Sequence, residues 1–139
     1  HDISSEDHVL EAGLGFAVKE NKAQSKFGGM IGADAVMAKR NDGLSQRLMQ
    51  FRLTDPDPLL YHNEAIYRDG AVIGYLTSGN YGHYLGGAIG LGYVKCNSIG
   101  ETAESQLNAH YQIDVAGKLV DAEVSLRPLY DPKALQVKL

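Results

Sequence analysis

Apolar and polar residues alternate most clearly between residues 47 and 53. Met49, Phe51 and Leu53 fall on one face of this segment, and the residues between them are polar. Because successive side chains of a strand point to opposite faces, the alternation predicts a strand with one buried face. Two Asp-Pro pairs at residues 55–58 then end the strand, since proline cannot donate a ladder hydrogen bond.

A short turn at Asp69-Gly70 predicts the first β-hairpin. Apolar segments at residues 65–68 and 71–74 flank this turn. The dipeptide suits a type I′ turn, because both central residues of that turn need a positive φ. The predicted register pairs Tyr67 with Val72 and Ile66 with Ile73.

A second β-hairpin is predicted around Ala116-Gly117. Its register pairs Ile113 with Val120 and Tyr111 with Ala122, and Val124 and Leu126 extend the same apolar face. The opposite face carries carboxylates, so a shift of one residue would bury them. The register of this hairpin is therefore well specified.

The remaining segments complete a mostly β fold. Residues 14–18 predict a short strand, residues 20–29 a polar loop, and residues 86–94 a glycine-rich strand. Residues 31–40 predict one helix, which ends at Asn41-Asp42-Gly43. The residues expected to share its apolar face are Ile31, Ala35, Val36 and Met37. We expect a small C-terminal β-barrel over residues 44–139, preceded by a short α+β segment over residues 1–43.

Composition narrows the class of protein. The formal net charge is −4, and lysine and arginine are scattered rather than gathered into the basic face of a nucleic-acid-binding protein. No apolar run approaches the roughly 20 residues of a membrane span, and the first residues lack the apolar core of a secretory signal. The single cysteine, Cys96, cannot form an internal disulfide and fits a reducing compartment.

Few residues form a recognisable catalytic pattern. The five histidines lack the spacing of a metal site, and a buried, hydrogen-bonded role is favoured for His83 over that of a catalytic base. Ser78 lacks a G-x-S-x-G context, and Lys95 would lower the pKa of the Cys96 thiol only modestly. The glycine-rich run at residues 86–92 leads into a strand, whereas a phosphate-binding loop opens a helix.

Two isolated charged residues remain as candidates for binding a ligand. Glu11 stands before the first apolar segment, either as a hydrogen-bonded loop carboxylate or as a ligand-facing group. Arg127 follows the last apolar strand, where it either forms a structural salt bridge or holds an anion in a bidentate manner.

Four segments in order resemble one known family. They are LEAGLGFAV at 10–18, MIGADAV at 30–36, LTSGNYGHYLGGAIGLGYV at 76–94 and SLRPLYDP at 125–132. Together they are similar to the C-terminal part of the glycine-cleavage T-protein (aminomethyltransferase) superfamily. Residues 61–79 and the RPLYDP ending are most similar to the tail of FAD-dependent dimethylglycine and sarcosine dehydrogenases.

The resemblance implies a folate-dependent one-carbon-transfer protein. It places residues 1–43 at the end of the folate-binding domain and residues 44–139 in the terminal barrel. The catalytic aspartate, the glutamate that holds the pterin and the FAD domain would all lie upstream, in the same parent chain. The residues expected to face tetrahydrofolate here are Glu11, Tyr81, Arg127 and Tyr130.

The resemblance also sets the expected activity and compartment. The isolated chain is expected to be inactive and to come from the bacterial cytoplasm or the mitochondrial matrix. The composition and spacing described above separately predict that it binds no metal, nucleic acid or membrane. The alternative hypothesis is a stand-alone β-barrel interaction module that has kept the fold and lost the chemistry.

Overall fold

A closed six-stranded barrel forms most of the protein. The computed structural model describes residues 2–18 and 29–138, so the loop predicted at 20–29 lies outside the described residues but for Gly29. The strands are β1 (Gln46–Leu53), β2 (Ala65–Arg68), β3 (Ala71–Gly82), β4 (Gly87–Lys95), β5 (Tyr111–Val115) and β6 (Lys118–Ser125). They are arranged in the order β1-β4-β3-β2-β5-β6, with antiparallel neighbours and with β6 closing on β1. The predicted mostly β fold is confirmed.

The core lies inside the barrel and comes from the inward faces of all six strands. In β1 the predicted alternation is confirmed, because Met49, Phe51 and Leu53 are almost fully buried. The ring of Phe51 meets that of Tyr111 edge to face across the interior, with centroids 5.6 Å apart. The other core residues are Leu60, Ile66, Leu76, Ala88, Val94, Ile113 and Val120.

The two hairpins follow the predicted turns, with one difference in register. The β5–β6 register is as predicted, and Tyr67 pairs with Val72 as expected. Ile66 pairs with Gly74 rather than with Ile73, because the register shifts at a bulge between Ile66 and Tyr67. At the end of β6, Val124 packs against the core, but Leu126 is 40% exposed, so the prediction for Leu126 was wrong. Leu126 lies just beyond the end of β6, where the alternation no longer applies.

The glycines of β3 and β4 allow these strands to pack closely inside the barrel. A Cβ atom on Gly74 would overlap the carbonyl oxygen of Tyr93, and one on Gly92 would lie 2.7 Å from the carbonyl oxygen of Tyr75. Glycine is therefore required here by space rather than by backbone angle.

The N-terminal part differs from the prediction in two ways. Residues 14–18 do not form a strand; Gly15–Ala17 form a 3₁₀ turn (η1), because the amides of Ala17 and Val18 bond to carbonyls three residues back. The helix α2 (Ala33–Asp42) begins and ends two residues later than predicted, and Gly43 follows it with a φ of 92°. Its predicted apolar face is only partly covered, since Val36 and Met37 are half-buried, whereas Ala35 is exposed and Ile31 lies outside the helix and is fully exposed.

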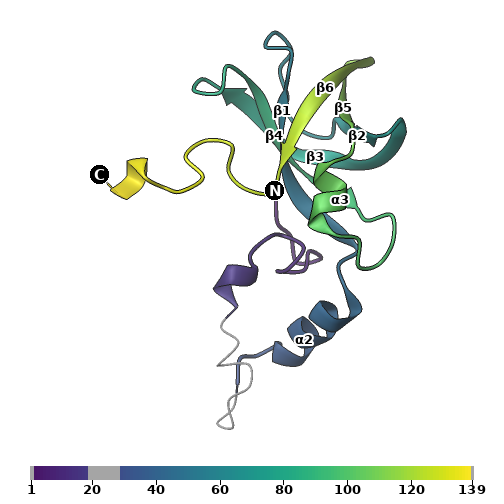
Figure 1. The fold of residues 1–139 in the computed structure, drawn as a ribbon, viewed down its shortest axis with the longest axis vertical. Coiled ribbons are helices and arrows are strands. Elements are labelled where there is room, and N and C mark those ends of the chain that lie inside the picture. The colour runs from purple at the N-terminus through teal and green to yellow at the C-terminus, as the bar shows by residue number, and fades with distance from the viewer. Residues whose placement is uncertain (1, 19–28, 139) are drawn as a thin grey trace.

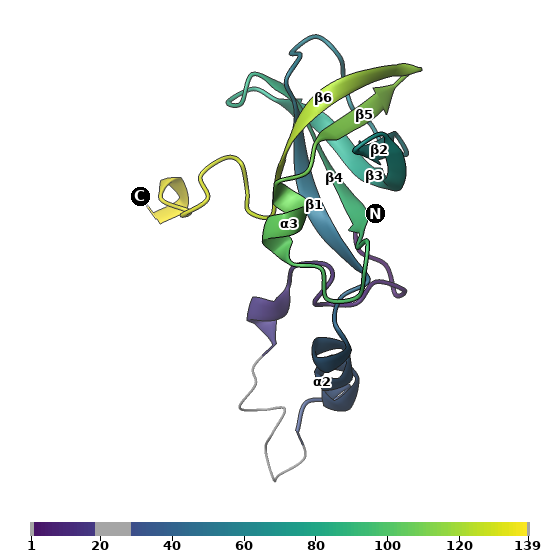
Figure 2. The same ribbon diagram turned by 45° about the vertical axis from the view of Figure 1, so that its right-hand side comes forward.

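Figure 1 shows α2 and the N-terminal segment below the barrel, and the segment after β6 leading away to one side. The short helix α3 (Ala103–Leu107) was not predicted, because five residues are too few to show a period. It lies at the lower end of the barrel, as the turned view in Figure 2 also shows. Near its N-terminus, Glu101 pairs with the buried Arg68 at 3.4 Å. A 3₁₀ turn, η2 (Gln136–Lys138), lies near the C-terminus.

Candidate functional site

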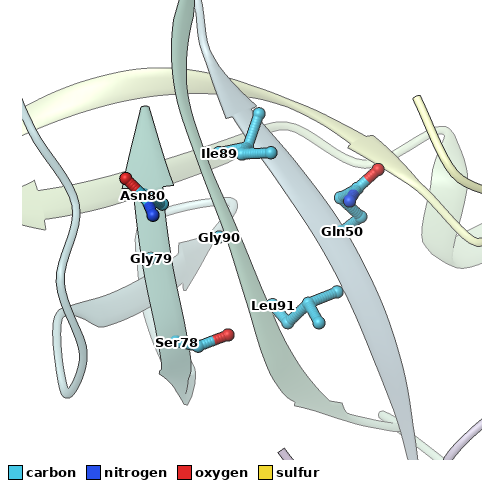
Figure 3. A pocket seen from close by; sticks show the side chains of 7 residues that line it. All are labelled: Gln50, Ser78, Gly79, Asn80, Ile89, Gly90 and Leu91. Carbon is cyan, nitrogen blue, oxygen red and sulfur yellow. The ribbon is translucent and has the colours of Figure 1, made fainter. Parts of the chain in front are cut away.

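Two adjoining cavities lie on the outer face of the barrel. Their volumes are about 290 Å³ and about 360 Å³, and Gln50 and Leu91 line both, so we call them together the outer groove. The first cavity is lined by Gln50, Ser78, Gly79, Asn80, Ile89, Gly90 and Leu91 (Figure 3). The second is lined by Ala12, Gly13, Leu14, Leu48, Met49, Gln50, Leu91, Ser125, Leu126, Arg127 and Pro128.

Arg127 gives the outer groove its electrostatic character. It is the one charged side chain among the described residues that line the two cavities. The walls around it are largely apolar, with leucines and Pro128 in the second cavity. A guanidinium group beside an apolar wall suits a ligand that joins a carboxylate to an apolar or aromatic body.

The segment after β6 holds Arg127 at the outer groove through two hydrogen bonds. The Arg127 backbone N–H donates to Ser125 Oγ at 3.1 Å. The Leu129 backbone N–H donates to Gln50 Oε1 at 2.7 Å. Because Gln50 belongs to β1, the second bond ties this segment to the barrel wall.

Glu11 is engaged in a structural contact. Its side chain is 5% exposed, and Oε1 accepts hydrogen bonds from the Ser45 N–H at 2.9 Å and the Ser45 hydroxyl at 2.6 Å. Lys39 Nζ lies 2.7 Å from the same oxygen. The carbonyl of Glu11 also accepts from the Leu48 N–H of β1. Glu11 therefore joins the N-terminal segment, α2 and β1, and it positions residues 12–14 at the second cavity.

The charge on Glu11 is strongly stabilised. Burial alone raises the pKa of this carboxyl, but hydrogen bonds from Lys39 and Ser45 outweigh burial and lower the pKa to about 2. The group is therefore ionised at neutral pH, with its Oε1 paired to Ser45 and Lys39.

The two tyrosines predicted to face folate lie near the β3–β4 turn. The ring of Tyr81 meets that of His83, with centroids 5.2 Å apart, and the ring of Tyr130 meets that of Tyr84 at 4.7 Å. Neither Tyr81 nor Tyr130 is among the residues lining the two cavities. The structure thus brings Arg127 and the Glu11 segment together at the second cavity. Both tyrosines lie outside the two cavities, Tyr81 next to Asn80 and Tyr130 against Tyr84.

Two expectations about reactive side chains were wrong. His83 is exposed rather than buried, because it belongs to the turn that projects beyond β3 and β4. Burial raises the pKa of the Cys96 thiol, although nearby Arg47 opposes the increase. Lys95 does not lower it overall, because its side chain is exposed at the end of β4.

Gln50 and Asn80 are site residues that the sequence did not single out. The alternation placed Gln50 on the polar face of its strand, but its partner Leu129 lies 79 residues away. No local pattern could have revealed that contact.

A third cavity, of about 600 Å³, lies between the loop before β2 and strand β3. It is lined by Tyr61, His62, Asn63, Tyr75, Leu76, Thr77, Ser78 and Gly79. None of the residues predicted to face a ligand lines this cavity. Over residues 2–18 and 29–138 there is no group of three potential metal ligands. Within the same ranges no helix is long and apolar enough to cross a membrane.

Comparison with known proteins agrees with the predicted resemblance. The chain is 34% identical over 138 residues to 4-methylaminobutanoate oxidase (formaldehyde-forming) of Paenarthrobacter nicotinovorans, a match that covers 99% of this chain and 15% of that protein. It is 34% identical to aminomethyltransferase of Anoxybacillus flavithermus, a match that covers 93% of this chain and 32% of that protein. It is 30% identical to mitochondrial sarcosine dehydrogenase of Mus musculus, a match that covers 99% of this chain and 14% of that protein.

The fold agrees as well. The crystal structure of aminomethyltransferase T from Bartonella henselae superimposes with a TM-score of 0.69 at 21% identity, covering 88% of this chain and 32% of that one. The chain therefore spans about a third or less of each relative. The family model of the glycine cleavage T-protein C-terminal barrel domain matches residues 46–131, from the first residue of β1 to beyond β6. The chain belongs to the glycine cleavage T-protein C-terminal barrel domain family.

Proposed function

We propose that this chain is the C-terminal part of a folate-dependent one-carbon-transfer protein, and that its outer groove forms one wall of a tetrahydrofolate site. Family membership supports the first half of the proposal. The second half rests on one observation, the single guanidinium of Arg127 in an otherwise uncharged groove. Tetrahydrofolate, when bound, would accept the one-carbon unit, and upstream folate and flavin domains would supply the remaining walls and the oxidation.

The residues of the outer groove fit the outer part of a folate better than its pterin. A pterin ring is commonly held by a carboxylate, and no described residue lining the two cavities carries one. Glu11 is nearest in sequence, but it is not among the lining residues, and its Oε1 is engaged by Ser45 and Lys39. A folate's glutamate tail instead offers carboxylates that match Arg127. Tyr81 and Tyr130 remain candidates for stacking on the aminobenzoyl ring.

The described residues do not fit FAD. A dinucleotide is held where a glycine-rich turn opens a helix. The densest glycine run of this chain instead forms β4, and a Cβ on Gly90 or Gly92 would meet Leu76 or Ile66 in the core. We therefore assign any flavin to another part of the parent chain.

The outer groove alone, as one wall of a site, should bind a reduced folate weakly. A charge-assisted contact and a stacked ring contribute about 1–3 kcal/mol. The loss of translational and rotational freedom costs an estimated 4–15 kcal/mol. We expect reduced folates to bind this chain with a dissociation constant of millimolar or weaker.

The proposal is tested by titrating the ¹⁵N-labelled chain with 5-formyltetrahydrofolate and following amide chemical shifts. We expect shift changes at Gln50, Leu91 and Arg127, and their loss in Arg127→Ala. The variant Lys118→Ala is the control, because Lys118 is an exposed cation at the β5–β6 turn whose partner is Asp55. Micromolar affinity would mean that a complete site exists here, and shifts confined to the third cavity would contradict the groove as the site.

The alternative function, a barrel that serves only for interaction, draws on the exposed apolar residues outside the barrel. Phe16 is 85% exposed and Ile31 is fully exposed, as expected of residues that contact further protein. The coding sequence upstream of His1 distinguishes the two proposals. An in-frame folate or flavin domain supports the first, and a start codon within a few residues supports the second.

A further inference from the structure

Gln50 lies where the two cavities of the outer groove meet. Its Cα pairs with that of Leu91 on β4 and with that of Ser125 on β6, so it is flanked by a strand on each side. The buried neighbours Met49 and Phe51 point into the core, so the side chain of Gln50 points outward. It is the one polar side chain that lines both cavities.

The orientation of the Gln50 amide is fixed by its partner. The Leu129 backbone N–H can only donate, so the side-chain atom at 2.7 Å from it must be the oxygen. The NH₂ group is then left at the other end of the amide, and no described residue accepts a hydrogen bond from it. In Figure 3 the nitrogen end of Gln50 lies on the side of β4, and the oxygen end lies away from it.

Asn80, at the other end of the first cavity, repeats this arrangement. Its Oδ1 accepts a hydrogen bond from the Tyr81 backbone N–H at 2.8 Å. The oxygen is therefore engaged by a backbone donor, and the NH₂ group remains. Thus both side-chain amides that line the outer groove have their oxygens engaged and their donors free, and Arg127 can only donate.

We infer that Gln50 and Asn80 orient a ligand in the outer groove by donating hydrogen bonds to its oxygen acceptors, while Arg127 holds its carboxylate. This inference rests on the proposed function and narrows it. The ligand class is a molecule with an apolar or aromatic body that carries a carboxylate and at least one further carbonyl or carboxylate oxygen. A ligand that offers donors at those positions would leave the amides unpaired and would be rejected.

Isosteric substitutions separate ligand binding from structure. Gln50→Glu keeps an oxygen to accept from the Leu129 N–H but replaces the free donor by an acceptor, and Asn80→Asp does the same for Tyr81. Gln50→Leu removes both functions. The variant Asn108→Asp, at the end of α3, is the matched control, because it makes the same change in net charge away from the groove.

The probe is p-aminobenzoyl-glutamate, which carries a ring, an amide carbonyl and two carboxylates. Two quantities are measured: the initial slope of amide shift changes against probe concentration, and the hydrogen-exchange protection of the Leu129 amide. For Gln50→Glu and for Asn80→Asp we expect the slope to fall about 3- to 10-fold or more, with Leu129 protection unchanged. Gln50→Leu should lower both the slope and the Leu129 protection, and Asn108→Asp should change neither quantity.

The outcomes that overturn the inference differ from those that overturn the proposed function. If Gln50→Glu and Asn80→Asp bind the probe as well as the parent does, the amides only support the fold and the inference is wrong. If Leu129 protection is lost in Gln50→Glu, the amide orientation is wrong. If the parent shows no shift changes in the groove with either the probe or 5-formyltetrahydrofolate, the proposed function fails, and the ligand role of both amides fails with it.

Discussion

Glu11 illustrates how one buried carboxylate can join separate parts of the chain. The side chain joins three parts of the chain, since it binds Ser45 before β1 and Lys39 of α2 while its own segment lines the second cavity. The printed contacts engage Oε1 of this carboxylate, and a role for Glu11 toward folate stays a prediction. Its backbone also positions residues 12–14 at the second cavity.

Replacing Glu11 by alanine should loosen this junction. Ser45 and Lys39 would lose their shared acceptor, and a hydrogen bond to a charged group contributes about 1.5–3 kcal/mol. We expect Glu11→Ala to lower the free energy of unfolding by about that amount in urea titrations and to speed amide exchange in α2. Glu6→Ala, an exposed carboxylate of the same segment, should change neither. Equal effects of the two variants would contradict the junction.

The same carboxylate predicts a dependence on pH. Its pKa is about 2 in the folded protein, below the ordinary value of 4.5. A group with a lowered pKa stabilises the fold above its unfolded pKa, and this contribution is lost as the pH falls through the folded value. The difference in unfolding free energy between the parent and Glu11→Gln should be full above pH 5 and should shrink from about pH 4.5 to pH 2. A difference that is constant over this range would show that Glu11 is not paired as described.

Among the elements, β3 and β4 pack closely because glycines leave room for the neighbouring backbone. Gly74 and Gly92 face neighbouring backbone at distances that exclude a Cβ. At Gly82, near the end of β3, a Cβ would meet its nearest atoms at 3.4 Å, an ordinary contact. The same residue type thus has different roles along one strand.

This difference can be measured with one pair of variants. Gly74→Ala forces β3 away from β4, and we expect a loss of about 1–3 kcal/mol or more, typical of overpacking. Gly82→Ala should change stability by about 0.5 kcal/mol or less. Denaturant midpoints measured in parallel would test both, and a tolerated Gly74→Ala would mean that the two strands pack less closely than described.

Strand β6 carries the seam that closes the barrel. Val124 pairs with Phe51 of β1 and packs against the core. A carboxylate there would lack a partner, at a cost of several kcal/mol, comparable to the stability of a small domain. We expect Val124→Asp to abolish cooperative thermal unfolding, whereas Leu119→Asp, at a 44% exposed position of the same strand, should melt within a few degrees of the parent. Similar melting of both variants would show that the β6 register is wrong.

Sequence patterns predicted those elements whose signals are local. The alternation in β1, the Asp69-Gly70 and Ala116-Gly117 turns and the glycine-rich strand β4 all lie where expected, because turn chemistry and burial act over a few residues. The bulge at Ile66 was missed, because a bulge depends on how β3 fits both of its neighbours. Residues 14–18 have a strand-like composition, but the amides of Ala17 and Val18 bond locally.

The candidate site was less predictable than the fold. Arg127 could be singled out as a charge at a strand end, and it lines the second cavity, but its role toward a ligand stays a prediction. The donor arrangement of Gln50 could not be predicted, because it depends on a contact between β1 and the segment after β6, where Leu129 lies 79 residues away. The roles of Tyr81 and Tyr130 remain predictions.

At the scale of the whole molecule, the chain has a closed barrel, and the proposed function gives it one wall of a site. It spans 14–32% of the relatives compared above, and its outer groove offers one charged side chain. Under the proposed function, other parts of a longer parent chain supply the rest of the chemistry.

The isolated chain should accordingly lack flavin chemistry. We expect the purified 139-residue chain, after incubation with FAD and gel filtration, to show no stoichiometric flavin absorbance, and to oxidise neither dimethylglycine nor sarcosine. The reason is that its glycine-rich run is a barrel strand rather than a dinucleotide-binding turn. A flavin spectrum at one equivalent would show that this chain binds FAD by itself and would contradict the assignment of flavin to another part of the parent chain.

The pairing of β1 with β6 also determines when the barrel can close during folding. Arg52 and Glu123 meet across this seam although 71 residues separate them. Such distant pairing must overcome a large loss of chain entropy, so barrels of this kind fold in milliseconds to seconds, more slowly than helical bundles. During synthesis, β1 emerges from the ribosome long before β6, and Met49, Phe51 and Leu53 stay open to water or to a chaperone until the last strand arrives.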